Sequence, residues 1–225
     1  MTLHVYNDLE QGSDAWLEAR RGIVTASVVG QLITPSTIKP ANNDKSRALT
    51  TLLVAERITG WSDPVYVSDD MMRGTLDEPV ARAIYAEHYA PVTEVGFMVR
   101  DDWGFRIGFS PDGLVGDDGA IEIKSRRAKT QLSTILYDEV PPANMGQIQC
   151  GLLVSGRKWC DYVSFAGGMP LYVKRVYADP RWHEAIVSAV RAFEREATRM
   201  TEIYAAAIAG RPATQRIDHF QEASL

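Results

Sequence analysis

A hairpin motif at residues 110–124 constrains the fold of this chain more than any other feature. Its last four residues, Ile121–Lys124, alternate apolar and polar side chains, which predicts a β-strand. The preceding Gly116-Asp-Asp-Gly119 sequence predicts the turn that joins this strand to the one before it. Because side chains two residues apart on a strand point to the same face, Glu122 and Lys124 are expected to project together.

The closed hairpin would bring a second carboxylate, that of Asp112, next to Glu122. Two carboxylates beside an ammonium group indicate a divalent-metal site, since Mg²⁺ is bound by one or two carboxylates together with waters and phosphate oxygens. Lys124 could then orient or deprotonate an attacking water and stabilise developing negative charge. The alternative is a solvated hairpin whose charges cluster by chance, and the hairpin alone leaves both interpretations open.

Three further segments occur with this hairpin. Pro111-Asp112 followed by Glu122-Ile123-Lys124 resembles the PD-(D/E)xK nuclease signature. The other segments are 11–27, 73–78 and 147–149, and their order and spacing are similar to those of one family. Over about residues 11–175 the chain resembles the phage lambda exonuclease type, the YqaJ-like viral recombinases.

The resemblance implies a fold and an activity. The expected fold is α/β and restriction-endonuclease-like, with a central mixed β-sheet flanked by helices in a single domain. The implied activity is a Mg²⁺-dependent 5′-to-3′ exonuclease that degrades one strand of linear double-stranded DNA to mononucleotides. It would leave 3′ single-stranded overhangs for phage-type homologous recombination. Mn²⁺ would substitute for Mg²⁺, and two ions would bind. The implied partners are duplex DNA with a 5′-phosphate, two further copies in a ring-shaped homotrimer, and a single-strand annealing protein.

The resemblance also assigns metal ligands. Asp112, Glu122 and the backbone carbonyl of Ile123 would bind metal directly, and Lys124 would position and activate the water. Glu78 would bind the second ion or one of its waters.

Glu78 has a competing interpretation. The Thr75-Leu-Asp-Glu78 sequence matches a capping box, which would explain a glutamate here without any metal. The two roles compete for one carboxylate, and the neighbouring Arg73-Gly74 favours the metal role.

In members of the family, the residues that match Arg20, Ser27 and Ser110 bind the 5′-phosphate of the DNA end. A helix expected over about 25–32 would present free N–H groups to such a phosphate. Without the family, Arg20 would be read as a surface charge and Thr25 as a simple helix cap.

Gln147 is expected in the middle of a helix at about 141–154, and its family counterpart contacts the active site. A solvated glutamine is the alternative reading there, and Gln149 is left without a role.

Composition fits one ordinary globular domain over residues 1–212, followed by a polar tail at 213–225. The 225 residues are 45% apolar and 24% charged. No apolar run approaches the roughly 20 residues of a membrane span, and the N-terminus lacks a signal-peptide pattern. A cytoplasmic location is expected, which the resemblance narrows to a bacterial host cell and a phage or prophage gene. Both cysteines, Cys150 and Cys160, are expected to be buried and reduced.

The net charge of −5 argues against a general nucleic-acid binder but not against a nuclease with concentrated basic residues. Arg126, Arg127 and Lys129 are the first candidates for such a surface.

Periodicity and caps predict the remaining elements. Helices are expected at 13–20, 46–59, 75–89, 128–137 and 181–209, and strands at 93–100, 104–109, 159–165 and 171–177. Residues 34–44 are expected to form a loop. Leu17 and His88 are expected to pack inward.

Two other functions are compatible with these residues. One is a structure- or sequence-specific DNA endonuclease of the same fold, which would cut a closed circle. The other is a non-catalytic DNA-end-binding protein, which would bind no metal.

Overall fold

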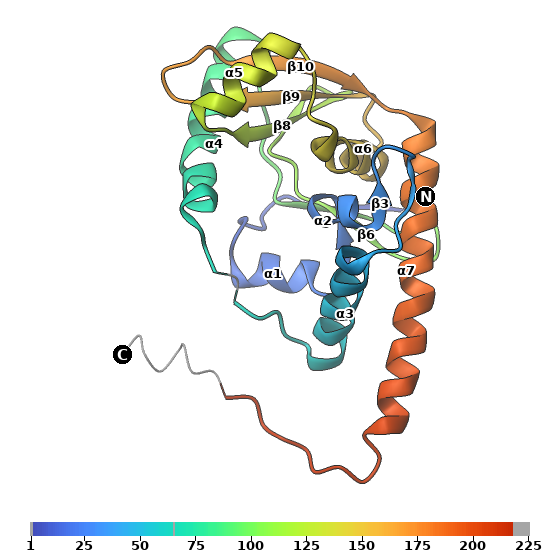
Figure 1. The fold of residues 1–225 in the computed structure, drawn as a ribbon. Coiled ribbons are helices and arrows are strands. Elements are labelled where there is room, and N and C mark those ends of the chain that lie inside the picture. Colours follow the sequence, from blue (N-terminus) through green and yellow to red (C-terminus); the bar gives the residue numbers. More distant parts are fainter. Residues whose placement is uncertain (1, 65, 218–225) are drawn as a thin grey trace.

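The computed structural model describes residues 2–64 and 66–217 (Figure 1). The helices are α1 Asp14–Arg20, α2 Ala26–Val29, the 3-10 helix η1 Gly30–Leu32, α3 Asp44–Thr59, α4 Asp69–His88, α5 Ala128–Tyr137, α6 Pro142–Ser155 and α7 Pro180–Ala207. The strands are β1 Leu3–Tyr6, β2 Val24–Thr25, β3 Ile33–Thr34, β4 Lys39–Pro40, β5 Phe97–Arg100, β6 Ile107–Phe109, β7 Gly113–Val115, β8 Gly119–Ser125, β9 Trp159–Phe165 and β10 Tyr172–Tyr177.

Apart from the β3–β4 hairpin, the strands of the described residues form two four-stranded mixed sheets, in the orders β1-β5-β6-β2 and β10-β9-β8-β7. Each sheet has one parallel pair, β2 with β6 and β8 with β9, and the other pairs are antiparallel. The predicted α/β class with mixed sheets flanked by helices is confirmed, although the strands divide into two sheets. The chain leaves the first sheet at Phe109 and enters the second at Gly113, so residues 110–112 bridge the two sheets.

The expected hairpin is formed by β7 and β8. Gly113 pairs with Ile121 and Val115 pairs with Gly119. The turn needs Gly116, whose φ of 50° lies in the left-handed region that favours glycine. This register extends to place Asp112 opposite Glu122.

Helices cover both faces of the second sheet. Ile121 and Ile123 of β8 are buried against Ala81 and Tyr85 of α4. On the other side, α6 lies between the two sheets and contacts β5, β6 and β9 (Figure 1). The predicted alternation along β8 is therefore confirmed, because Ile121 and Ile123 lie in the α4 core.

The start of α4 differs from the prediction. The helix begins at Asp69, where the Ser68 side chain caps it by accepting a hydrogen bond from the Met71 N–H at 3.3 Å. Thr75 lies inside the helix and donates its hydroxyl to the Met71 carbonyl at 3.3 Å. The predicted capping box at Thr75 is therefore wrong, because the helix already begins at the Ser68 cap and continues through Gly74 and Pro79.

Three smaller predictions were also wrong. Leu17 is 42% exposed, and His88 lies exposed at the end of α4. The helix expected at 25–32, by contrast, is present as α2 followed directly by η1. The expected loop at 34–44 contains the β3–β4 hairpin.

The remaining predicted elements are present, although the strands expected at 93–100 and 104–109 are shortened to β5 and β6. Helix α7 buries its apolar stripe from Trp182 to Ala197. Cys150 and Cys160 are free and buried, as expected. Among the described residues, no helix has the length and apolar character to cross a membrane.

Part of the expected polar tail lies against α3. The guanidinium of Arg216 sits 4.0 Å from the centre of the Trp61 ring. Residues 218–225 of that tail lie outside the described residues.

Candidate active site

Asp112 and Glu122 meet at the end of the β7–β8 hairpin. The Asp112 carboxylate accepts a hydrogen bond from the Ile123 N–H at 2.6 Å. Glu122 is almost fully buried, with 1% of its surface exposed. The β-ladder therefore brings the two carboxylates together, as the hairpin motif predicted.

Lys124 joins this pair from the same face of β8. Its Nζ lies 2.6 Å from Oε1 of Glu122 and donates a hydrogen bond to Oε1 of Gln147 at 3.2 Å. Gln147 comes from α6, and this contact places it beside Lys124, while its role in the chemistry stays a prediction.

Gln149, two residues further along α6, has a different role. Its side chain donates to the Tyr177 carbonyl at 2.8 Å and accepts from the Asp179 N–H at 2.9 Å. Gln149 therefore fastens α6 to the segment between β10 and α7, away from the carboxylates.

The site carries more negative charge than its own cations neutralise. Burial raises the pKa of Asp112 well above its ordinary value, and the carboxylates of Glu122 and Glu78 raise it further. Burial likewise raises the pKa of Glu78, although the Arg82 guanidinium opposes the shift. Burial disfavours the charged form of Lys124, but Glu122 and Asp112 outweigh it and raise the pKa of the ammonium. Clustered carboxylates of this kind are stabilised by a bound cation.

The donor set fits a hard divalent ion. Oε1 of Glu122 is buried and has no hydrogen-bond partner in the described part of the chain, although it is ion-paired with Lys124. Two carboxylates and a main-chain carbonyl at Ile123 suit Mg²⁺, which keeps several waters. Within residues 2–64 and 66–217, no three His, Cys, Asp or Glu side chains are already arranged as metal ligands. Glu78 instead pairs with Arg82, so its metal role remains a prediction.

A second cluster contains all three residues predicted to grip a phosphate. The guanidinium of Arg20 donates to Ser110 Oγ at 2.9 Å and to Ser27 Oγ at 3.2 Å. The Trp16 indole N–H also donates to Ser110 Oγ, at 3.0 Å, and Thr25 Oγ1 lies 3.0 Å from Ser27 Oγ. We call Trp16, Arg20, Thr25, Ser27 and Ser110 the hydroxyl cluster.

Sequence reasoning missed Trp16 and treated Thr25 only as a possible cap. Trp16 precedes Arg20 by one helical turn, and the guanidinium lies 3.9 Å from the centre of its ring. That spacing could have indicated a stacked pair. Thr25 is the N-cap residue of α2, as the alternative reading had it, but its side chain makes no capping hydrogen bond and lies against Ser27 instead.

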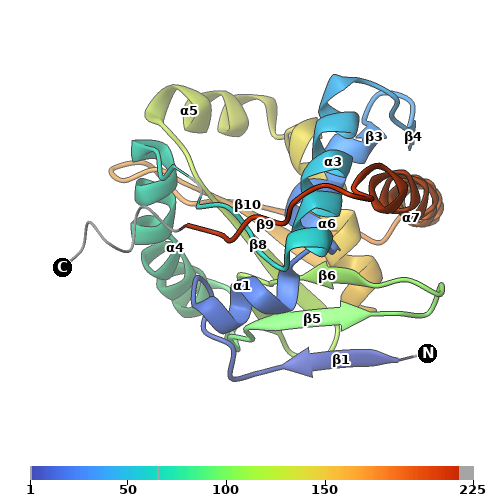
Figure 2. The ribbon, with the colours of Figure 1, turned by 90° about the horizontal axis from the view of Figure 1, so that it is seen from below.

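The hydroxyl cluster suits an anion. Burial lowers the pKa of Arg20 to about 10, against the charge of Glu56, which leaves the guanidinium charged at neutral pH. The cluster thus offers one cation and three hydroxyls. In both Figure 1 and Figure 2, α1, which supplies Arg20, lies between α3 and α4.

The basic residues after Lys124 are mostly engaged within the chain. Arg126 donates to Asn144 at 2.8 Å, and Arg127 pairs with Asp70 at 2.9 Å. Lys129 is exposed on α5. A basic surface at these residues therefore remains a prediction.

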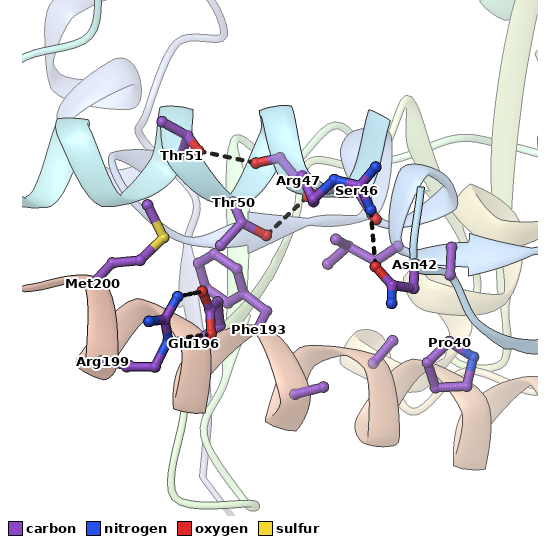
Figure 3. A pocket seen from close by; sticks show the side chains of 14 residues that line it. Pro40, Asn42, Ser46, Arg47, Thr50, Thr51, Phe193, Glu196, Arg199 and Met200 are labelled. Carbon is purple, nitrogen blue, oxygen red and sulfur yellow. Dashed lines mark hydrogen bonds and ion pairs between the residues drawn. The ribbon is translucent and has the colours of Figure 1, made fainter. Parts of the chain in front are cut away.

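A separate cavity of about 500 Å³ lies between α3 and α7 (Figure 3). Its polar side chains bond to nearby residues: Arg199 to Glu196 at 2.9 Å and Arg47 to Asn42 at 3.0 Å. It shares no residue with either cluster, so we assign it no part in the chemistry.

The fold and the Asp112–Glu122–Lys124 constellation place the chain in the PD-(D/E)xK class with a restriction-endonuclease-like fold. Within that class, the model of the YqaJ-like viral recombinase domain matches residues 15–158. The chain belongs to this family.

Solved structures agree with this assignment. An alkaline exonuclease from Laribacter hongkongensis is 33% identical, with a TM-score of 0.78 over 88% of this chain and 98% of that one. The same protein in complex with dAMP matches equally well. A phage-related exonuclease from Haemophilus somnus 129PT, 13% identical with a TM-score of 0.57 over 80% of this chain and 96% of that one, shares the fold. No curated protein sequence matches the chain.

Proposed function

We propose that this chain is a Mg²⁺-dependent exonuclease that digests one strand of linear duplex DNA from its 5′ end. It would release mononucleotides and leave a 3′ single-stranded overhang for phage-type recombination. The observation that carries the proposal is that a site suited to an anion and a site suited to a cation lie next to each other. Ser110 of the hydroxyl cluster and Asp112 of the carboxylate site are separated only by Pro111.

The short distance between Ser110 and Asp112 supports the release of products of one or two nucleotides. Two residues span at most about 7 Å, and one DNA strand advances about 3.4 Å per nucleotide along the helix axis. A terminal phosphate held at Ser110 would therefore place a phosphodiester one or two nucleotides away near Asp112. The similar Laribacter hongkongensis enzyme was crystallised with dAMP, a nucleoside monophosphate.

The metal would be held by Asp112, Glu122 and the Ile123 carbonyl, with Glu78 at a second ion, and Mn²⁺ would substitute. When bound, the ion supplies Lewis-acid activation of the phosphate and lowers the pKa of water.

The protein's own groups would orient the reactants. The Lys124 ammonium, held by Glu122 and Gln147, donates hydrogen bonds that position water and stabilise negative charge developing on the phosphate. Arg20, Ser27 and Ser110 would fix the 5′-phosphate, which sets the register of the strand.

The resemblance also supports a ring-shaped homotrimer, a single-strand annealing partner and action in the cytoplasm of a phage-infected bacterium. Light scattering of the purified chain would measure the predicted threefold mass.

The deciding assay offers three duplexes with and without Mg²⁺: linear with 5′-phosphate, linear with 5′-hydroxyl, and covalently closed circular. We expect Mg²⁺-dependent release of mononucleotides, fastest from the 5′-phosphorylated duplex, and an intact circle. Cutting of the circle would identify an endonuclease instead. Binding of DNA ends without cleavage in Mg²⁺ or Mn²⁺ would identify a non-catalytic end-binding protein.

A further inference from the structure

We infer that Arg82 is a positioning residue that holds the main chain of Asp112 and the carboxylate of Glu78 at the metal site. Its Nε donates to the Asp112 carbonyl at 2.7 Å, and its Nη2 pairs with the Glu78 carboxylate. Its remaining nitrogen, Nη1, donates to Glu94 at 2.7 Å. One guanidinium thus links helix α4 to the bridge between the two sheets. This inference rests on the proposed function for its activity readout, but not for its binding readout.

The bridge needs such a contact because Asp112 lies between strands. Residues 110–112 fall after β6 and before β7, outside the named strands of either sheet. The Arg82 hydrogen bond fixes the Asp112 carbonyl, while the Ile123 N–H fixes its carboxylate. Together they determine where this carboxylate points.

Arg82 also forms an ion pair with Glu78 of the same helix. The two residues are one turn apart on α4, so their side chains lie on the same face. Only 15% of the Arg82 side chain is exposed, against 31% for Glu78. The contact is thus partly shielded from water and holds Glu78 near the carboxylate of Glu122, whose charge also acts on it.

The planar fork of an arginine is essential to this arrangement. A guanidinium offers donors in several fixed directions, whereas a lysine ammonium is a compact point charge on a flexible stem. Lysine at this position would keep the charge but could not hold Asp112, Glu78 and Glu94 in the same geometry.

The third acceptor provides a matched control. The Glu94 side chain is 71% exposed, so its ion pair contributes little. Glu94→Gln removes one charge next to Arg82 and leaves the contacts to Asp112 and Glu78 in place.

The experiment titrates Mn²⁺ into wild type, Arg82→Gln, Arg82→Lys and Glu94→Gln by calorimetry without DNA. Melting temperatures and the Mg²⁺ concentration for half-maximal digestion are measured on the same samples. We expect both Arg82 variants to bind Mn²⁺ about 10–100-fold more weakly, because outer residues that orient metal ligands typically have effects of this size. Glu94→Gln should stay within about threefold of wild type.

Several results would overturn the inference. Wild-type Mn²⁺ affinity in Arg82→Gln would show that the contacts do not matter, and wild-type affinity in Arg82→Lys would show that only charge matters. Tighter binding would show that Arg82 merely repels the ion. Unfolding of both variants at the assay temperature would assign Arg82 to the fold itself. Failure of the wild type to bind Mn²⁺ would overturn both this inference and the proposed metal site, whereas the other outcomes leave the proposed function standing.

Discussion

The carboxylate site and the hydroxyl cluster lie at opposite ends of the same three residues, 110–112, and are built in opposite ways. The carboxylate site gathers like charges, and burial raises the pKa of Asp112 and of Glu78. The hydroxyl cluster surrounds one cation, Arg20, with neutral donors and acceptors that already bond to one another. We therefore expect the first arrangement to bind a cation and the second to bind an anion.

The contrast suggests how the short segment 110–112 can couple two binding events. A divalent ion at Asp112 and a terminal phosphate at Ser110 would each be favoured by local electrostatics alone. Their covalent connection through Pro111 fixes the distance between them. Substitutions at the carboxylate site should therefore impair cleavage, whereas substitutions in the hydroxyl cluster should impair recognition of the 5′-phosphate.

The largest effect is expected from Lys124→Ala. Under the proposed mechanism the Lys124 ammonium stabilises charge on the scissile phosphate, so its loss should reduce cleavage by about 10²–10³-fold or more. Binding of DNA ends, measured by fluorescence anisotropy, should stay intact because the hydroxyl cluster is untouched. Lys45→Ala, which changes an exposed lysine on α3, is the control. Unchanged digestion of a 5′-phosphorylated duplex by Lys124→Ala would refute the role assigned to this residue.

Arg20→Ala should act on substrate choice. The variant should lose about 10–100-fold of the preference for a 5′-phosphate over a 5′-hydroxyl, since hydrogen bonds to charged groups contribute about 1.5–3 kcal/mol. The ratio of kcat/KM for the two duplexes measures this. Arg47→Ala, an exposed arginine on α3, should keep the preference. An equal preference in Arg20→Ala and wild type would separate the hydroxyl cluster from phosphate binding.

Substitutions of the two glutamines of α6 should affect different properties, catalysis for Gln147 and stability for Gln149. Gln147→Ala should lower kcat about tenfold, the equivalent of one hydrogen bond to a charged group, with little change in melting temperature. Gln149→Ala should keep kcat but reduce the free energy of unfolding by about 1–3 kcal/mol, because the buried Gln149 side chain is lost and two part-buried backbone groups lose their partner. The reverse pattern would contradict the placement of both residues.

The smallest effect is expected from Ser27→Ala. Ser27 is exposed and supplies one of three hydroxyls, so its loss should reduce the 5′-phosphate preference only about threefold, or less than 1 kcal/mol. Single-turnover digestion of both duplexes would measure it, with Ser133→Ala as the control. A loss as large as that of Arg20→Ala would mean that the hydroxyls, not the guanidinium, carry recognition.

Local patterns were enough to predict the hairpin and much of the carboxylate site. Alternation along β8 determines that Glu122 and Lys124 share a face, and the turn glycines determine the register that brings Asp112 to them. Both depend on residues close in sequence.

Contacts across long stretches of the chain were harder to predict. Trp16 and Ser110 are 94 residues apart, and Arg82 reaches Asp112 across 30. The capping-box pattern also misled at α4, where Thr75 suggested a later start than the Ser68 cap that the helix uses. The family resemblance supplied Arg20, Ser27 and Ser110, which no local pattern indicated.

The most direct test is anomalous scattering from a crystal of this protein soaked in Mn²⁺. The account predicts a peak within coordinating distance of Asp112 and Glu122, on the side where Lys124 meets Gln147. An empty map at that position, with manganese bound elsewhere or not at all, would contradict it.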